Sequence, residues 1–279
     1  MSNAPAPTAL NMNKIVGTHH LVLITLDSLR YDAAQQAWER GLTPGLARFL
    51  PSQGWERRHT PGNFTYPAHQ AFFAGFLPTP ARPGLHPRLF ATRFLGATTP
   101  VDETFIFDQA DIVTGLSAQG YYTLCVGGVG FFNKKTSLSS TFPSMFDESH
   151  WQESFGVTDP CSAQHQVDYA VERVQEIAPS NKLFLFINIS AIHQPNYFYL
   201  DLPDHQAGQD SVESQVAALA YVDSQLPRLF EVLAGYGPVF CILCSDHGEA
   251  YGEDGFFGHR LNHPVVLDVP YTHFVYTAQ

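Results

Sequence analysis

The feature of this sequence that most constrains its fold is a series of short apolar runs, each followed directly by polar residues. Runs of this length indicate strands that are buried on both faces, as in a parallel sheet covered by helices. The predicted strands occupy residues 20–26, 121–126, 183–187 and 239–244, with further strand expected over 265–276.

Helical patterns separate the predicted strands. Thr43 precedes Pro44, and Thr65 stands shortly before Pro67, which is the usual chemistry of a helix start. The second of these helices is expected to end at Gly75. Further helices are predicted over residues 108–119, 164–178 and 211–235. This alternation predicts an α/β fold of three layers, in which a mostly parallel sheet has helices on both faces.

Length and composition favour one globular domain. Of the 279 residues, 44% are hydrophobic and 15% are charged, as expected for a chain that buries a core. We interpret residues 1–17 as a flexible lead-in, 18–279 as a single catalytic domain and 79–105 as a surface loop. The sequence shows neither a signal peptide nor a long apolar stretch, which predicts a cytoplasmic location without membrane contact.

The charge balance limits the possible partners. The formal net charge is -11, which disfavours binding to nucleic acid or to an anionic membrane. A bound cation would still attract a small anionic substrate to one cleft. Cys241 and Cys244 fall on one predicted strand and face opposite sides of it, so we expect core thiols there. The sequence does not indicate the oligomeric state.

Polar residues stand at the ends of three predicted strands, where α/β proteins build their sites. Asp27 follows the first strand, the stretch 188–193 follows another, and Asp246-His247 follows a third. Carboxylates and an imidazole that converge at one edge of a sheet can bind a divalent cation. Taken alone, Asp27 fits a helix N-cap equally well.

Thr65 has two possible roles. As an N-cap, its hydroxyl would bind a backbone N–H of the helix, and its position alone favours this role. As a nucleophile, it would use the same helix N-terminus, where an anion is stabilised. His193 and His259 lie in polar and aromatic surroundings and are candidate site residues. Four other histidines are expected to be structural or to support the site: His19, His20, His69 and His263.

Three segments resemble motifs of the alkaline-phosphatase and sulfatase superfamily, in the order in which that superfamily has them. Residues 23–32, LITLDSLRYD, look like its first metal motif. Residues 65–78, TYPAHQAFFAGFLP, resemble the nucleophile motif of nucleotide pyrophosphatase/phosphodiesterases. Residues 245–259, SDHGEAYGEDGFFGH, resemble the signature of phosphoethanolamine transferases.

The resemblance implies a role for each matching residue. Asp27, Thr65, Asp246 and His247 would hold one divalent metal, most simply Zn²⁺, with Mn²⁺ as the alternative. His259 would bind the transferred group or a second metal. Residues 192–195 look like the His-x-Pro segment of sulfatase relatives, which places His193 on the anion. Two further residues, Asn133 and Lys134, are candidates for substrate binding.

Departures from the family patterns narrow the chemistry. Sulfatases that use formylglycine need Cys or Ser at the nucleophile position and a downstream Arg, where this chain has Thr65 and His69. Two-metal phosphodiesterases have an Asp four residues before the histidine, where Ile189 stands before His193. Asn188 is close but offers only a neutral, weaker ligand. We therefore expect one metal, and we do not expect a formylglycine-dependent sulfatase.

The predicted function is hydrolysis of phosphate mono- or diesters, with Thr65 as the nucleophile and a phosphothreonine intermediate. His259 or His193 would act as general acid or orient the leaving group. Two alternatives remain: a phospho-group transferase in a biosynthetic pathway, and a catalytically silent metal-binding scaffold. The segments 79–105 and 131–160 are expected to form the wall that selects the substrate.

Overall fold

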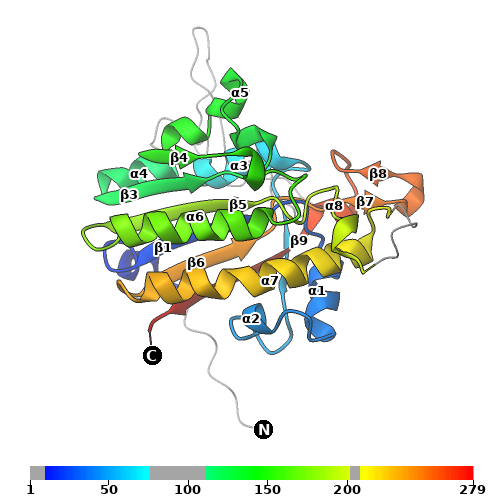
Figure 1. Cartoon of the computed structure of the whole chain (residues 1–279), viewed down its shortest axis with the longest axis horizontal. Coiled ribbons are helices and arrows are strands. Elements are labelled where there is room, and N and C mark those ends of the chain that lie inside the picture. Colours follow the sequence, from blue (N-terminus) through cyan, green and yellow to red (C-terminus); the bar gives the residue numbers. More distant parts are fainter. Residues whose placement is uncertain (1–9, 76–110, 202–207, 279) are drawn as a thin grey trace, which may run out of the picture.

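The computed structural model describes residues 10–75, 111–201 and 208–278. Seven strands form one sheet in the order β2-β9-β6-β1-β5-β3-β4 (Figure 1). Neighbouring strands are parallel except where β9 meets β6 and β2, so β9 alone runs against the others. The strands are β1 His20–Leu26, β2 Glu56–His59, β3 Tyr121–Val126, β4 Glu148–His150, β5 Lys182–Ile189, β6 Val239–Cys244 and β9 Asp268–Tyr276.

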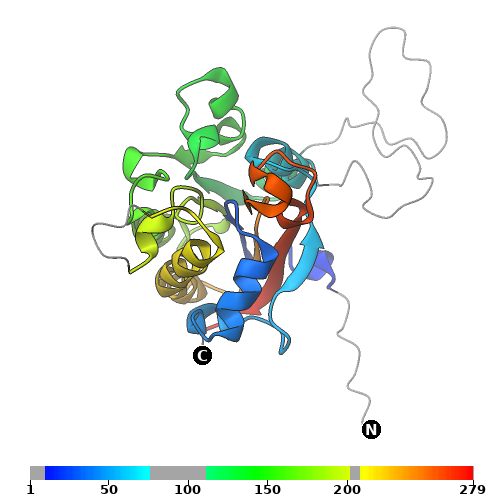
Figure 2. The same ribbon diagram turned by 90° about the vertical axis from the view of Figure 1, so that its right-hand side faces the viewer.

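Helices cover both faces of this sheet, which confirms the predicted three-layer α/β architecture. In Figure 2, α1 and α7 lie on one side of β9, and the short helix near the N-terminus lies on the other. The helices are α1 Tyr31–Glu39, α2 Pro44–Ala47, α3 Thr65–Ala74, α4 Ile112–Ala118, α5 Ser137–Ser140, α6 Ser162–Ile177, α7 Val212–Ala234 and α8 Pro264–Leu267. A separate hairpin pairs β7, Ala250–Tyr251, with β8, Phe257–Gly258.

Two hydrophobic clusters fill the spaces between the layers. Successive side chains of a strand point to opposite faces, and β5 shows the consequence: Leu185 belongs to the cluster under α6 and α7, while Phe186 belongs to the cluster under α3 and α4. Cys241 and Cys244 are buried free thiols, as expected. Because β1, β5 and β6 are buried on both faces, the ends of these strands are fixed firmly.

Three expectations at the level of elements need correction or fall outside the structure. Within the lead-in expected over 1–17, Met12–Lys14 form a 3-10 helix and Ile15 is buried in the second cluster, so this part is packed. The strand expected from 265 begins only at Asp268, because Pro264 starts a short helix there. The loop expected over 79–105 lies outside the described residues. Among the described residues, no helix is long and apolar enough to cross a bilayer.

The edge strand β4 is tied to the layer of helices by a polar network around Glu148. Its carboxylate accepts hydrogen bonds from Arg173 Nε at 2.6 Å and Nη2 at 2.8 Å, and from the Tyr122 hydroxyl at 2.9 Å. It also contacts the His150 ring. The hydrogen bonds from Arg173 are the main cause that lowers the pKa of Glu148 to about 2, from an ordinary value of 4.5.

We predict that Glu148→Gln lowers the free energy of unfolding at pH 7 by about 2 kcal/mol, since it removes charge-assisted hydrogen bonds. A carboxylate whose pKa is depressed on folding contributes its stability above the unfolded pKa and loses it as the pH falls. The difference between variant and wild type therefore shrinks from pH 4.5 down to about 2. Urea unfolding across this range measures it. Glu176→Gln, which removes an exposed partner of Arg173, should change little.

Candidate active site

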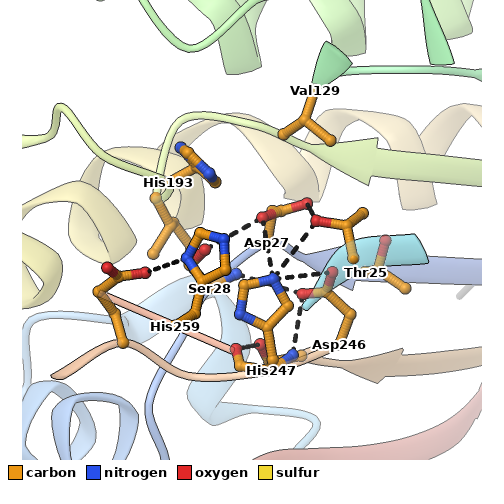
Figure 3. A network of polar contacts seen from close by, with 12 residues as sticks. Thr25, Asp27, Ser28, Val129, His193, Asp246, His247 and His259 are labelled. Atoms are coloured by element: carbon orange, nitrogen blue, oxygen red, sulfur yellow. Dashed lines mark hydrogen bonds and ion pairs between the residues drawn. The ribbon is translucent and has the colours of Figure 1, made fainter. Parts of the chain in front are cut away.

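The candidate site lies at the carboxyl ends of three adjacent central strands. Thr25 on β1 pairs with Asn188 on β5 and with Cys244 on β6. The residues that follow these positions, Asp27 and Asp246, are therefore brought to one edge of the sheet. Both side chains are fully buried, and Figure 3 shows them facing each other across a small polar space.

The turn after β1 holds the two carboxylates in place. Ser28 adopts a left-handed conformation with φ of 64°, which turns its backbone N–H toward Asp246 Oδ1 at 3.2 Å. Its hydroxyl donates to Asp27 Oδ1 at 3.1 Å. Asn188 donates its side-chain amide to Asp27 Oδ2 at 3.0 Å. The predicted N-cap role of Asp27 is wrong, because α1 begins later, with Arg30 as its N-cap.

Asp246, Asp27 and His247 have the donor set of a metal site. Asp246 Oδ2 is buried and has no hydrogen-bond partner among the residues that the structure describes. An unpaired buried oxygen is costly unless a bound cation compensates its charge. His247 Nε2 lies 3.6 Å from this oxygen and 3.8 Å from Asp27 Oδ1. His247 Nδ1 donates to Gly248 O at 2.9 Å, so the Nε2 lone pair faces the two carboxylates. This tautomer and these ligand types fit Zn²⁺.

Charge explains why this group would bind a cation. Burial, followed by the charge of Asp27, raises the pKa of Asp246 well above its ordinary value. Burial acts on Asp27 as well, but the nearby His193 and His247 rings and the Asn188 amide outweigh it and lower its pKa. Burial lowers the pKa of His247 to about 4. At neutral pH the imidazole is therefore uncharged and can offer its Nε2 lone pair to a metal. A divalent cation would relieve the repulsion between the two carboxylates when both are ionised.

Thr65 is the first residue of α3, and its hydroxyl points at this group. Thr65 Oγ1 lies 3.3 Å from His247 Nε2 and 3.5 Å from Asp27 Oδ2. The N-cap of α3 is Phe64, in an extended conformation, so the N-cap role of Thr65 is wrong. The free backbone N–H groups at the start of α3 favour negative charge beside this hydroxyl.

His69 links the backbone of Thr65 to strand β1 through its two ring nitrogens. One ring nitrogen, Nδ1, donates to Thr65 O at 2.8 Å, and Nε2 lies 3.0 Å from Thr25 Oγ1. The ring is fully buried among phenylalanines, including Phe132 and Phe186, and burial lowers its pKa to about 4. The structure thus gives His69 the supporting position that the sequence predicts for it.

The remaining histidines with a predicted supporting or structural role lie elsewhere. His20 is buried at the start of β1, opposite to the site, where Nδ1 accepts from Leu183 N at 3.2 Å. His19 contacts the hydroxyl of its neighbour Thr18. His263 is the N-cap of α8.

His193 and His259 stand on the open side of the site (Figure 3). Their ring centroids are 5.8 Å apart, and the His259 ring is 4.7 Å from that of His247. His193 Nδ1 contacts Gln194 O at 2.6 Å. His259 Nδ1 contacts Glu249 Oε2 at 2.8 Å. No hydrogen bond from the described part of the chain reaches the other nitrogen, Nε2, of either ring.

Glu249 is a site residue that the sequence argument missed. It is 1% exposed and contacts His259, and within the described ranges its second oxygen has no hydrogen-bond partner. Two groups of three residues each bring their ligand atoms within 4.8 Å of one another. One group is Asp27, Asp246 and His247, and the other is His247, Glu249 and His259. His259 thus stands beside the first group. The signal was present, because Glu249 lies two residues after His247 in the run SDHGE.

Asn188 supports the site and supplies no ligand. Its side-chain oxygen accepts from Val129 N at 3.0 Å, and its amide nitrogen donates to Thr25 and Asp27. Both ends of the side chain are therefore used. The interpretation of Asn188 as a weak metal ligand is corrected, since its nitrogen faces Asp27.

A cavity of about 390 Å³ is lined by Thr65, His193 and His259. Residues of the segment 131–160 form part of its wall, and Asn133 is among them. Lys134 does not line this cavity, because its ammonium group donates to Ser149 O at 2.6 Å. The expectation that Lys134 contacts the substrate is therefore corrected.

Comparisons with known proteins agree with this geometry. The family model described as Sulfatase matches residues 19–266. The soluble domain of lipooligosaccharide phosphoethanolamine transferase A from Neisseria meningitidis superposes with a TM-score of 0.61 at 14% identity, over 93% of this chain and 77% of that one. The C-terminal periplasmic domain of EcEptC from Escherichia coli, in complex with Zn, gives 0.59 at 15% identity, over 95% and 74%. No curated protein matches the sequence.

A third structure is the lipoteichoic acid synthase LtaP from Listeria monocytogenes. Its TM-score is 0.58 at 12% identity, over 95% of this chain and 67% of that one. At such identities the likeness shows a common fold. Members of this superfamily act on phosphate or sulfate esters and depend on a metal.

The cytoplasmic location that we expected is contradicted by these structures. The matched domains of EptC from Campylobacter jejuni and of EcEptC are periplasmic, and transferase A of N. meningitidis is also known as an integral membrane protein. The composition of the N-terminal residues was therefore no guide to the compartment.

The shared fold comes from a comparison of coordinates, and the family comes from a comparison of sequence. The family model includes the strand ends that carry Asp27 and Asp246. The family model spans most of the sequence, and this chain belongs to the sulfatase family of the alkaline phosphatase superfamily.

Proposed function

We propose that this chain transfers a phospho group from an ester donor to an acceptor hydroxyl, through a covalent intermediate on Thr65. One observation carries the proposal: the Thr65 hydroxyl lies within 3.5 Å of both Asp27 and His247, at the start of a helix. A hydroxyl in this position suits nucleophilic attack on an anionic ester, because the anion is stabilised where the nucleophile stands.

Asp27, Asp246 and His247, together with the Thr65 hydroxyl, would hold the metal. We propose Zn²⁺, with Mn²⁺ as the alternative, because the donors combine carboxylates with an imidazole. When bound, the cation would lower the pKa of the threonine hydroxyl and stabilise negative charge on the phosphoryl oxygens. The unpartnered Asp246 Oδ2 supports this assignment.

In the first half-reaction, the Thr65 oxygen forms a bond to phosphorus as the bond to the leaving oxygen breaks. The threonine proton passes to water, and the leaving oxygen takes a proton from a histidine. In the second half-reaction, an acceptor hydroxyl attacks phosphorus and gives its proton to the same histidine. The threonine oxygen leaves and is protonated again, so that donor and acceptor have exchanged the phospho group.

Of the two histidines, His259 suits the proton transfer better. Its Nδ1 is held by the Glu249 carboxylate at 2.8 Å, which stabilises the ring when it is protonated. Among the described residues, the only hydrogen-bond partner of the His193 ring is the carbonyl oxygen of Gln194. This contact fixes the orientation of the ring but stabilises a cationic ring less than a carboxylate at hydrogen-bond distance does. We therefore assign His259 as the general acid and base, and His193 to binding of the phosphoryl oxygens together with Asn133.

The comparisons favour transfer over the hydrolysis predicted from the sequence. Several matched structures are phosphoethanolamine transferases, and another is a lipoteichoic acid synthase. Both reactions use the same first half-reaction and differ only in whether an alcohol or water takes the phospho group. The periplasmic origin of some matched domains supports an extracytoplasmic site of action. The threonine nucleophile speaks against formylglycine-dependent sulfate cleavage.

The metal assignment predicts that zinc stabilises the wild type and that Asp246→Asn abolishes this effect. At a zinc concentration a hundredfold above Kd, a ligand that binds only the folded state adds about 2.7 kcal/mol to the free energy of unfolding. Thermal unfolding with zinc and with a chelator measures the gain. Asp168→Asn, on the outer side of α6, should keep the full gain. An equal gain in Asp246→Asn would contradict the assignment.

The nucleophile assignment predicts that Thr65→Ala lowers kcat at least about 10³-fold on nitrophenyl phosphate monoesters, diesters or phosphonates. Thr65→Ser keeps a hydroxyl and should retain part of the activity. Adding an alcohol such as ethanolamine or glycerol separates the two reactions: for transfer, nitrophenol release exceeds the release of free phosphate or phosphonate. A fully active Thr65→Ala would rule out the covalent route, and equal release of both products would support hydrolysis.

The role of Glu249 predicts that Glu249→Gln lowers kcat about 10²-fold, because the amide no longer supports a protonated His259. The zinc content should stay unchanged. Steady-state kinetics and metal analysis of the same preparations measure both quantities. Asp254→Asn, an exposed carboxylate on the same hairpin, is the control and should alter kcat less than about twofold. Loss of zinc in Glu249→Gln would instead make this carboxylate a ligand.

A further inference from the structure

Arg30 stands out within the described part of the chain as the only arginine or lysine whose side chain is buried. It is 3% exposed, and it lies in the turn between β1 and α1, three residues after Asp27. Burial of a guanidinium is costly unless its donors are paired. The partners of Arg30 therefore show what the residue does.

Its guanidinium joins two segments that are far apart in sequence. Nε and Nη2 donate to the two oxygens of Asp32 at 2.8 and 2.6 Å. Nη1 reaches across to the hairpin of β7 and β8, where it contacts the Glu253 carboxylate and lies 3.3 Å from Glu249 O. The group also lies over the Tyr251 ring, 5.7 Å from its centroid. Only the planar guanidinium of an arginine, with its five N–H donors, can bond to Asp32 and to the hairpin at the same time.

The backbone that carries Arg30 is itself fixed. Gln215 of α7, fully buried, accepts from Arg30 N at 3.2 Å and donates to Ser28 O at 2.6 Å. The same turn orients Asp27 and Asp246 through Ser28. Arg30 is therefore anchored to the part of the structure that holds the proposed metal ligands.

The β7–β8 hairpin, which Arg30 contacts, carries the site residues Glu249 and His259 at its two ends. Glu249 precedes β7, and His259 follows β8, with Ala250 paired to Gly258 between them. Figure 1 shows the hairpin projecting from the edge of the domain, beyond the main sheet. Two strands of two residues hold each other weakly. A backbone hydrogen bond from Arg260 N to Asn63 O, at 2.7 Å, ties the end of the hairpin to the segment before Thr65. On the side of Glu249 and Glu253, the contacts of Arg30 supply a second tie.

We infer that Arg30 is a positioning residue that sets His259 relative to Thr65 by clamping the β7–β8 hairpin to the β1–α1 turn. The inference rests on the proposed role of His259 in proton transfer. Lysine keeps the charge but offers a single point of contact, so Arg30→Lys should release the hairpin while the metal ligands stay in place. Glu253→Gln removes the carboxylate partner from the hairpin side and should act in the same direction.

The test compares Arg30→Lys and Glu253→Gln in the wild type and in a His259→Asn background, with Arg57→Lys on the exposed strand β2 as control. We expect each variant to lower kcat about tenfold or more, since small misplacements of a reacting group are costly. KM and zinc content should change little. In the His259→Asn background, the same substitutions should cost almost nothing further.

An equal loss in both backgrounds, or a loss of zinc that parallels the loss of kcat, would overturn the inference. Glu253→Gln decides the matter if Arg30→Lys does not fold. The ring-nitrogen NMR signals of His259 in ¹⁵N-histidine-labelled protein provide a readout without turnover. If the wild type cleaves no ester, the proposed function fails, yet displaced His259 signals in Glu253→Gln would still support the clamp, and unchanged signals would refute it.

Discussion

Two carboxylates buried side by side are the constraint on which the rest of this structure depends. Asp27 and Asp246 have no exposed surface, and in a medium of low dielectric their repulsion is large. Each contact around them reduces this cost: the Ser28 backbone and hydroxyl, the Asn188 amide and the uncharged His247 ring. A divalent cation would remove the rest, which is why the geometry fits a metal site so closely.

This pair could arise only at adjacent strand ends near the middle of the sheet. β1 lies between β5 and β6 with both faces covered, so its end cannot shift without disturbing two hydrophobic clusters. The chain must then leave the site through tight turns. A Cβ atom at Gly248 would lie 2.0 Å from Val265 O, so glycine is required directly after His247. The order Asp246-His247-Gly248 thus follows from packing as well as from chemistry.

The sequence predicts the part of the site that follows from strand periodicity. Apolar runs locate the strands, and parallel strands end at one edge, so the convergence of Asp27, Asp246 and His247 was predictable. Glu249 was not, because its contact with His259 depends on a hairpin of two-residue strands that leaves little pattern. Lys134 looked suitable as a charge, but its left-handed backbone, with φ of 56°, directs it to Ser149. The short helix α8 could have been predicted from Pro264, because proline is common at the first position of a helix. The apolar run after Pro264 was instead interpreted as the start of a strand.

The site is built in two halves that are held by different means. The half that would bind the metal is part of the sheet, and its precision comes from the hydrophobic core. The half that would move protons is attached to a small hairpin whose own ladder is too short to fix it. Arg30 belongs to the first half by its backbone and to the second by its side chain. Because proton transfer tolerates little misalignment, a link of this kind would allow a hairpin with a short ladder to place His259 accurately relative to Thr65, which is fixed at the start of α3.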